Sequence, residues 1–205
     1  MDDTILSLKD RYPGQTLYIV GRGPSLAYLK PSHFGSGPII TINQAIQVVQ
    51  DFKLPNDLYS MQKDGCNGWN DGTYCMGRCE VTPPMSIPND ERIMVILQRP
   101  GYSYACLPDY PNKLYMTPTV HLEGVDFDSE MSTVLAVEIG RQIMKCAHVV
   151  LMCMDSFQGE FNSYGGQTEE QLSRNVGYYA YAIRRLQRIF ADTNYPHTLF
   201  IPEAI

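Results

Sequence analysis

The chain has 205 residues, of which 44% are hydrophobic and 19% are charged, and its net charge is −6. One hydrophobic core can serve about 250–300 residues, so we expect residues 1–205 to form a single domain. The acidic balance opposes bulk binding to nucleic acid or to anionic lipid, because both depend on basic patches.

The N-terminal segment predicts neither secretion nor membrane insertion. Its residues, MDDTILSLKDRYPG, lack the positive region and the apolar region of a secretory signal. No window of the sequence approaches the roughly 18 uninterrupted apolar residues of a membrane span. We therefore expect a cytoplasmic protein, and Cys146 and Cys153 lie in apolar runs that fit reduced thiols. The oligomeric state stays open.

Two strand–helix–strand units are predicted in the first third of the chain. The run 16–20 is apolar and β-rich, and it ends in glycines. A second run, 38–43, is followed by helical spacing over 44–52 and by a third strand over 57–61. Repeated strand–helix–strand units indicate a parallel sheet with right-handed crossovers.

The middle of the chain predicts two lid-like insertions, 63–90 and 99–128. The first is rich in Gly, Asn, Pro and Cys and shows no regular period, as is typical of functional loops. Short strands are predicted over 92–97 and 113–116.

The last third predicts a helix over 129–144 with Ser129 as its N-cap. A continuous apolar run over 147–154, typical of a central parallel strand, is followed by a helix over 167–190 and a strand over 197–201. The expected fold class is therefore α/β, a Rossmann-like open sheet of about six mostly parallel strands flanked by helices.

The first strand leads into the turn Gly21-Arg22-Gly23-Pro24-Ser25. Glycines allow a sharp turn and close approach of a ligand, and the start of the next helix offers N–H groups to a phosphate. Pro24 suits the first helical turn, where no N–H is needed. The turn therefore predicts a site for a nucleotide or another phosphate-bearing ligand.

Polar residues follow several predicted strands. Ligands of open parallel sheets bind beyond the carboxyl ends of the strands, so these side chains are expected to converge. They are Arg22, Asn43, Gln44, Gln62, Asp64 and Asp155.

Four motifs together resemble a known family. The motifs GRGPSL, TINQA, DLYSMQKDG and SEMSTVLAVEIGRQIMKCAHVVLMCMDSF occur in this order. They closely resemble the bacterial sialyltransferases that decorate lipooligosaccharide, which carry G-N-G-P-S-L, C-N-Q, T-S-G and G-x-D-F motifs. The same skeleton occurs in a wider group that includes the archaeal-type 6-hydroxymethyldihydropterin pyrophosphokinases.

The resemblance implies a glycosyltransferase that moves a sugar from a CMP- or UDP-type nucleotide-sugar donor to an acceptor hydroxyl of unknown identity. It implies that Gly21, Arg22 and Ser25 surround the donor's phosphate and ribose. By the same resemblance the nucleotide is also contacted by Asn43, Gln44, Ser132 and Thr133, and Asp155 takes the place of the G-x-D-F acid.

Two departures from the family motifs bear on chemistry. Arg22 replaces the asparagine of the family loop and adds a guanidinium that can clamp a phosphate. Leu172 aligns where the family has its general-base histidine. The remaining candidates for a catalytic base are Asp64, His121 and Asp155.

Three alternatives remain open. A magnesium-dependent pyrophosphokinase would position magnesium with Asp64 or Asp155, whereas the resembling sialyltransferases do not require magnesium. Asp126 and Asp128, with Asp64, are further carboxylates that could hold the ion. A non-catalytic nucleotide-binding protein fits the missing histidine. Zinc at Cys66, Cys75 and Cys79, with Cys106 or His121, has no common zinc spacing, so no metal residue is assigned.

Overall fold

The computed structural model describes residues 4–63, 90–98, 110–116, 120–127, 129–165 and 169–204. Within these ranges, seven strands form one sheet in the order β5-β4-β3-β2-β1-β6-β7, and every neighbouring pair is parallel. The strands are β1 (Thr16–Val20), β2 (Ile39–Ile42), β3 (Leu58–Met61), β4 (Met94–Leu97), β5 (Lys113–Tyr115), β6 (His148–Met152) and β7 (His197–Phe200). The prediction of a Rossmann-like open α/β sheet is confirmed, and each of the seven predicted strand runs contains one strand.

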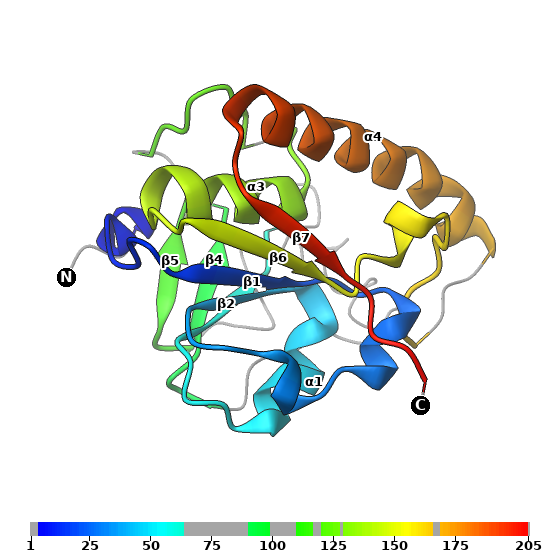
Figure 1. The fold of residues 1–205 in the computed structure, drawn as a ribbon, viewed down its shortest axis with the longest axis horizontal. Helices are drawn as coiled ribbons and strands as arrows, with labels where there is room; N and C mark the ends of the chain where they lie inside the picture. The colour runs from blue at the N-terminus through cyan, green and yellow to red at the C-terminus, as the bar shows by residue number, and fades with distance from the viewer. Residues whose placement is uncertain are drawn as a thin grey trace, which may run out of the picture.

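Helices cover both faces of this sheet (Figure 1). On one face lie α3 (Ser132–Glu138), which continues as the π-helical turn Ile139–Ile143, and α4 (Glu169–Thr193), while α1 (Ile46–Val49) lies on the other. The short 3₁₀ helices are Ile5–Leu8, Pro24–Tyr28 (called η2), Pro31–His33, Asn43–Ala45, Gln50–Phe52 and Asp155–Gln158. Apolar side chains of both layers form the core.

The strand order reverses at β1. Strands β2 to β5 follow one another on one side of β1. Strands β6 and β7 lie on the other side of β1. Because the connections leave β1 and β6 in opposite directions, their carboxyl ends mark the topological switch point of the sheet, where ligands of such folds usually bind. The turn Gly21–Ser25 and Asp155 both lie there.

Two local helix predictions need correction. The helix expected over 129–144 begins at Ser132, with Met131 in the N-cap position. The Ser129 hydroxyl instead donates to Asp126 Oδ2 at 2.9 Å, so this side chain serves the preceding loop. The helix expected over 44–52 consists of three consecutive short helical segments rather than one regular helix.

The predicted lid segment 63–90 falls almost wholly outside the described residues, and its role as a lid stays a prediction. Segment 99–128 is described over 110–116 and 120–127, where it supplies β5 to the sheet, so the lid interpretation is wrong for that strand. In the part of the chain that the structure describes, no helix combines the length and the apolar character that crossing a bilayer requires.

Burial of two thiols predicts a fall in stability at alkaline pH. Burial raises the pKa of Cys146 and of Cys153 to about 12, whereas an unfolded thiol ionises at about 8.5. Above pH 8.5 the unfolded chain therefore loses these protons first, and the stability present below this pH is lost as the pH rises towards 12. Urea unfolding at pH 8 and at pH 11 measures the decrease.

Cys146→Ala removes one of the two groups, so its free energy of unfolding is expected to fall less between the two pH values than that of the wild type. An equal fall in both proteins would contradict this assignment.

Candidate functional site

The pairing of β1, β2 and β3 aligns the residues that follow these strands. Arg22, Asn43 and Gln62 each lie two residues beyond mutually paired positions of the three strands. They therefore form one row across the carboxyl edge of the sheet. The prediction that polar residues of these strand ends converge is confirmed for this row.

Hydrogen bonds connect the row into a cluster. Arg22 Nη1 donates to Gln44 Oε1 at 2.5 Å, which joins the ends of β1 and β2. Gln62 Nε2 donates to the Asn43 carbonyl at 3.0 Å and to Ser60 Oγ at 2.8 Å, which joins β2 to β3. Asn43 has a left-handed backbone with φ of 50°, a conformation that asparagine tolerates better than most residues. We call Arg22, Asn43, Gln44 and Gln62 the strand-end cluster.

Arg22 carries the unusual electrostatics of the strand-end cluster. Its side chain is half-buried, and burial lowers its pKa, an effect that the nearby Tyr179 partly opposes. Among the described residues no carboxylate pairs with this guanidinium, and its buried Nε has no hydrogen-bond partner. A buried charge without a counter-charge is costly, so an anionic ligand here would be stabilised strongly.

Gln62 has a second unsatisfied group in the same cluster. The side chain is fully buried, and within the described residues its Oε1 has no partner. Within the part of the chain that is described, the strand-end cluster thus contains a buried donor without a partner, Arg22 Nε, and a buried acceptor without a partner, Gln62 Oε1. A ligand with both an anionic group and a hydrogen-bond donor would satisfy both.

The turn Gly21–Ser25 is arranged differently from the expectation. Its amides were expected to be free for a phosphate. Three of them instead donate to the last residue of β6 and to two residues that follow this strand. The pairs are Gly21 N to Met152 O at 2.8 Å, Gly23 N to Cys153 O at 3.0 Å and Ser25 N to Asp155 Oδ1 at 3.1 Å. An anion at this turn would therefore be bound by the Arg22 side chain rather than by these amides.

The side chain of Asp155 lies at the N-terminal end of η2. Its Oδ2 accepts a 2.6 Å hydrogen bond from Ser25 Oγ, in addition to the bond from the Ser25 amide, and the side chain is buried. The carboxylate takes the place at the helix start where a phosphate was expected. Each oxygen of the Asp155 carboxylate therefore accepts one hydrogen bond from Ser25.

The start of α3 lies beside the end of β3. Lys63 Nζ donates to the Glu130 carbonyl at 2.6 Å, two residues before α3 begins at Ser132. Ser132 is buried and Thr133 is partly exposed. These two predicted nucleotide contacts are therefore near the strand ends, although the hydrogen bonds that connect the strand-end cluster involve neither of them. Lys63 and Glu130 lie inside two of the quoted motifs but were not predicted as site residues, because the resemblance assigns neither of them a role.

Of the other two candidate bases, the structure describes His121 but not Asp64. His121 is exposed and makes no hydrogen bond or ion pair within the described part of the chain. Asp64 lies outside the described residues, as do Asp128 and the thiols of the zinc hypothesis, Cys66, Cys75, Cys79 and Cys106. Among residues that are described, no group of three metal-binding side chains occurs.

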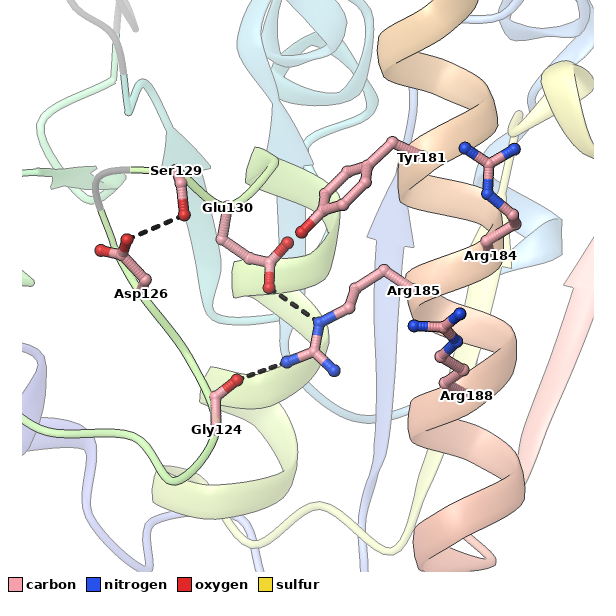
Figure 2. Close-up of a pocket in the computed structure, with 8 residues that line it drawn as sticks. All are labelled: Gly124, Asp126, Ser129, Glu130, Tyr181, Arg184, Arg185 and Arg188. Atoms are coloured by element: carbon pink, nitrogen blue, oxygen red, sulfur yellow. Dashed lines mark hydrogen bonds and ion pairs between the residues drawn. The ribbon is translucent and has the colours of Figure 1, made fainter.

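A second polar site was not predicted from the sequence. A pocket of about 460 Å³ lies between α4 and the loop before α3 (Figure 2). Its lining residues are Gly124, Asp126, Ser129, Glu130, Tyr181, Arg184, Arg185 and Arg188. The spacing of the three arginines on the predicted helix 167–190 is the signal that could have indicated it, since residues one turn apart share a helix face. We call this site the arginine pocket.

Fold and strand-end cluster together define the class of this protein, an open parallel α/β domain of the Rossmann-like type. No model of a known protein family matches the chain, and no curated protein sequence matches it either.

Proposed function

We propose that this protein is a transferase that binds a nucleotide sugar of the CMP or UDP type at the strand-end cluster and moves the sugar to an acceptor hydroxyl. The observation that carries the proposal is the half-buried Arg22 guanidinium, which has no carboxylate partner among the described residues. A nucleotide diphosphate or monophosphate supplies the missing negative charge at the topological switch point of the sheet.

The unused groups of the cluster support a nucleotide rather than a bare anion. Arg22 Nε offers a donor to a phosphate oxygen, and Gln62 Oε1 offers an acceptor to a ribose hydroxyl or a base amino group. Asn43 and Gln44 stand between them in the same cluster. The four motifs of the sequence, with their order and spacing, support sugar transfer as the reaction.

Calorimetric titration tests the proposal directly. The purified protein is titrated with CMP, UDP, GDP, ATP and their sugar conjugates, with and without magnesium, and each mixture is then analysed for released nucleotide. We expect a pyrimidine nucleotide sugar to bind without magnesium and to be turned over once a suitable acceptor is added. Magnesium-dependent consumption of ATP would replace the proposal by a pyrophosphokinase, and absence of binding by every nucleotide would refute it.

One observation favours a second candidate, a nucleotide-binding protein without catalysis. Asp155 is buried and engaged with Ser25, and His121 is exposed without a partner in the described part of the chain. Neither residue is therefore poised to take a proton from an acceptor. Tight nucleotide binding with no turnover for any acceptor in the panel would favour this candidate.

A further inference from the structure

Hydrogen bonds hold part of the lining of the arginine pocket in place. The loop that carries Gly124 is tied to the π-helical turn, where Gln142 Oε1 accepts from Glu123 N at 2.8 Å and Gln142 Nε2 donates to Glu123 O at 3.0 Å. On the other side, Arg185 Nη2 donates to the Gly124 carbonyl (Figure 2). Gly124 and Arg185 are thus held in place on the two sides of the pocket, between α4 and this loop.

Positive charge in the pocket exceeds what its own carboxylates neutralise. Glu130 pairs with Arg185 through an Nε–Oε2 distance of 2.9 Å. Within the described part of the chain neither Arg184 nor Arg188 forms an ion pair, and both are exposed at the pocket. Two guanidinium groups one helical turn apart can bind the oxygens of one anion.

Glu130 supplies a hydrogen-bond acceptor in the same pocket as these arginines. Its side chain is about 4% exposed, and its Oε1 is buried with no hydrogen-bond partner among the residues described. The Tyr181 hydroxyl points towards this carboxylate from α4 (Figure 2), and burial, followed by a hydrogen-bonding interaction with Glu130, raises the pKa of Tyr181. The phenol therefore stays protonated at neutral pH and faces the carboxylate as a donor. A ligand hydroxyl that donates to Glu130 Oε1 would share this buried carboxylate with Tyr181.

We propose that the arginine pocket binds a polyhydroxylated anion of one or two sugar units, with its anionic group on Arg184 and Arg188 and a hydroxyl on Glu130. The volume of about 460 Å³ suits a ligand of this size. The pocket is lined by none of the residues of the strand-end cluster, so it is a second site next to the proposed nucleotide site. Phosphate and carboxylate are the two anionic groups that arginine forks recognise, and the experiment separates them.

Titration calorimetry with small probes at low ionic strength tests the proposal. Ribose 5-phosphate and gluconate carry hydroxyls with a phosphate or a carboxylate, methyl phosphate carries the anion alone, and ribose carries the hydroxyls alone. We expect at least one of the two hydroxylated anions to bind about tenfold more tightly than methyl phosphate, and ribose to give no measurable heat. Absence of binding by both hydroxylated anions, or binding no tighter than that of methyl phosphate, overturns the proposal.

A charge-matched pair of variants assigns the binding to this pocket. R184E/R188E reverses the two exposed arginines, and K9E/K30E reverses two exposed lysines elsewhere, so both variants change the net charge equally. The first is expected to lower the affinity at least tenfold and the second to leave it within twofold, with unchanged circular dichroism in both. Equal losses in the two variants overturn the proposal. Arg22→Gln is expected to leave this binding intact, which distinguishes it from the nucleotide site.

Discussion

Gly23→Ala is expected to destabilise the fold by about 3 kcal/mol, because the turn after β1 has no room for a methyl group. A Cβ at this position would lie 1.8 Å from Asp155 Oδ2 and 2.7 Å from the Cys153 carbonyl oxygen. The backbone φ of Gly23 is −65°, which alanine adopts without strain, so the effect is one of space alone. Urea unfolding of the purified variant measures the loss.

Gly177→Ala is the matched control for this prediction. Gly177 lies within α4, and a Cβ there meets no atom within 4 Å. Alanine is favoured over glycine inside a helix, so this variant is expected to gain about 0.5–1 kcal/mol. If Gly23→Ala unfolds at the same urea concentration as the wild type, the contact between the turn and Asp155 is not as the structure has it.

The double variant Gly23→Ala/Asp155→Ala separates the two clashes. Removing the carboxylate relieves the contact at 1.8 Å but not the contact with the Cys153 carbonyl oxygen. We therefore expect the double variant to lose less stability than the sum of the two single variants, since residues in contact do not act additively.

Arg22→Gln is expected to weaken nucleotide binding by about 10- to 100-fold, which corresponds to about 1.5–3 kcal/mol for a hydrogen bond to a charged group. Glutamine keeps a polar partner for Gln44 but removes the only positive charge of the strand-end cluster. Arg22→Lys retains the charge without the planar fork, so an intermediate affinity is expected. The nucleotide that binds most tightly to the wild type is the ligand for these titrations.

The unfolding temperature of Arg22→Gln distinguishes the loss of a ligand contact from damage to the fold. Burial lowers the pKa of Arg22, which means that the protein environment disfavours this charge in the absence of ligand. Arg22→Gln without nucleotide is therefore expected to unfold at a temperature at least as high as that of the wild type. Weaker binding together with a lower unfolding temperature would indicate a structural role for Arg22 instead. Lys30→Gln, an exposed change, serves as the control.

The strands were predictable because their apolar, β-branched runs are buried and bounded by clear breakers. The run 16–20 corresponds to β1 residue for residue, and 38–43, 57–61 and 147–154 each contain a strand. Strand order was less accessible, since nothing local in the sequence states that β6 pairs with β1 rather than with β5. The crossover rules fixed the parallel direction but not this neighbour.

The candidate site was predictable in part, because strand ends define where polar residues gather. Arg22, Asn43, Gln44 and Gln62 were expected at one edge and lie there. The partners of Asp155 were not predictable, since Ser25 is 130 positions away and no motif pairs a serine amide with a distant carboxylate. Likewise, the arginine pocket depends on Glu130, whose place against α4 follows from packing rather than from local sequence.

The central place of β1 also has a consequence for synthesis of the protein. One side of β1 can pair with β2 soon after both leave the ribosome, but its other side must wait for β6, which begins at His148. At ordinary translation speeds this wait is on the order of ten seconds. During that time the nascent chain presents an unpaired, apolar strand edge, so chaperones are expected to engage this protein before its last third has been made.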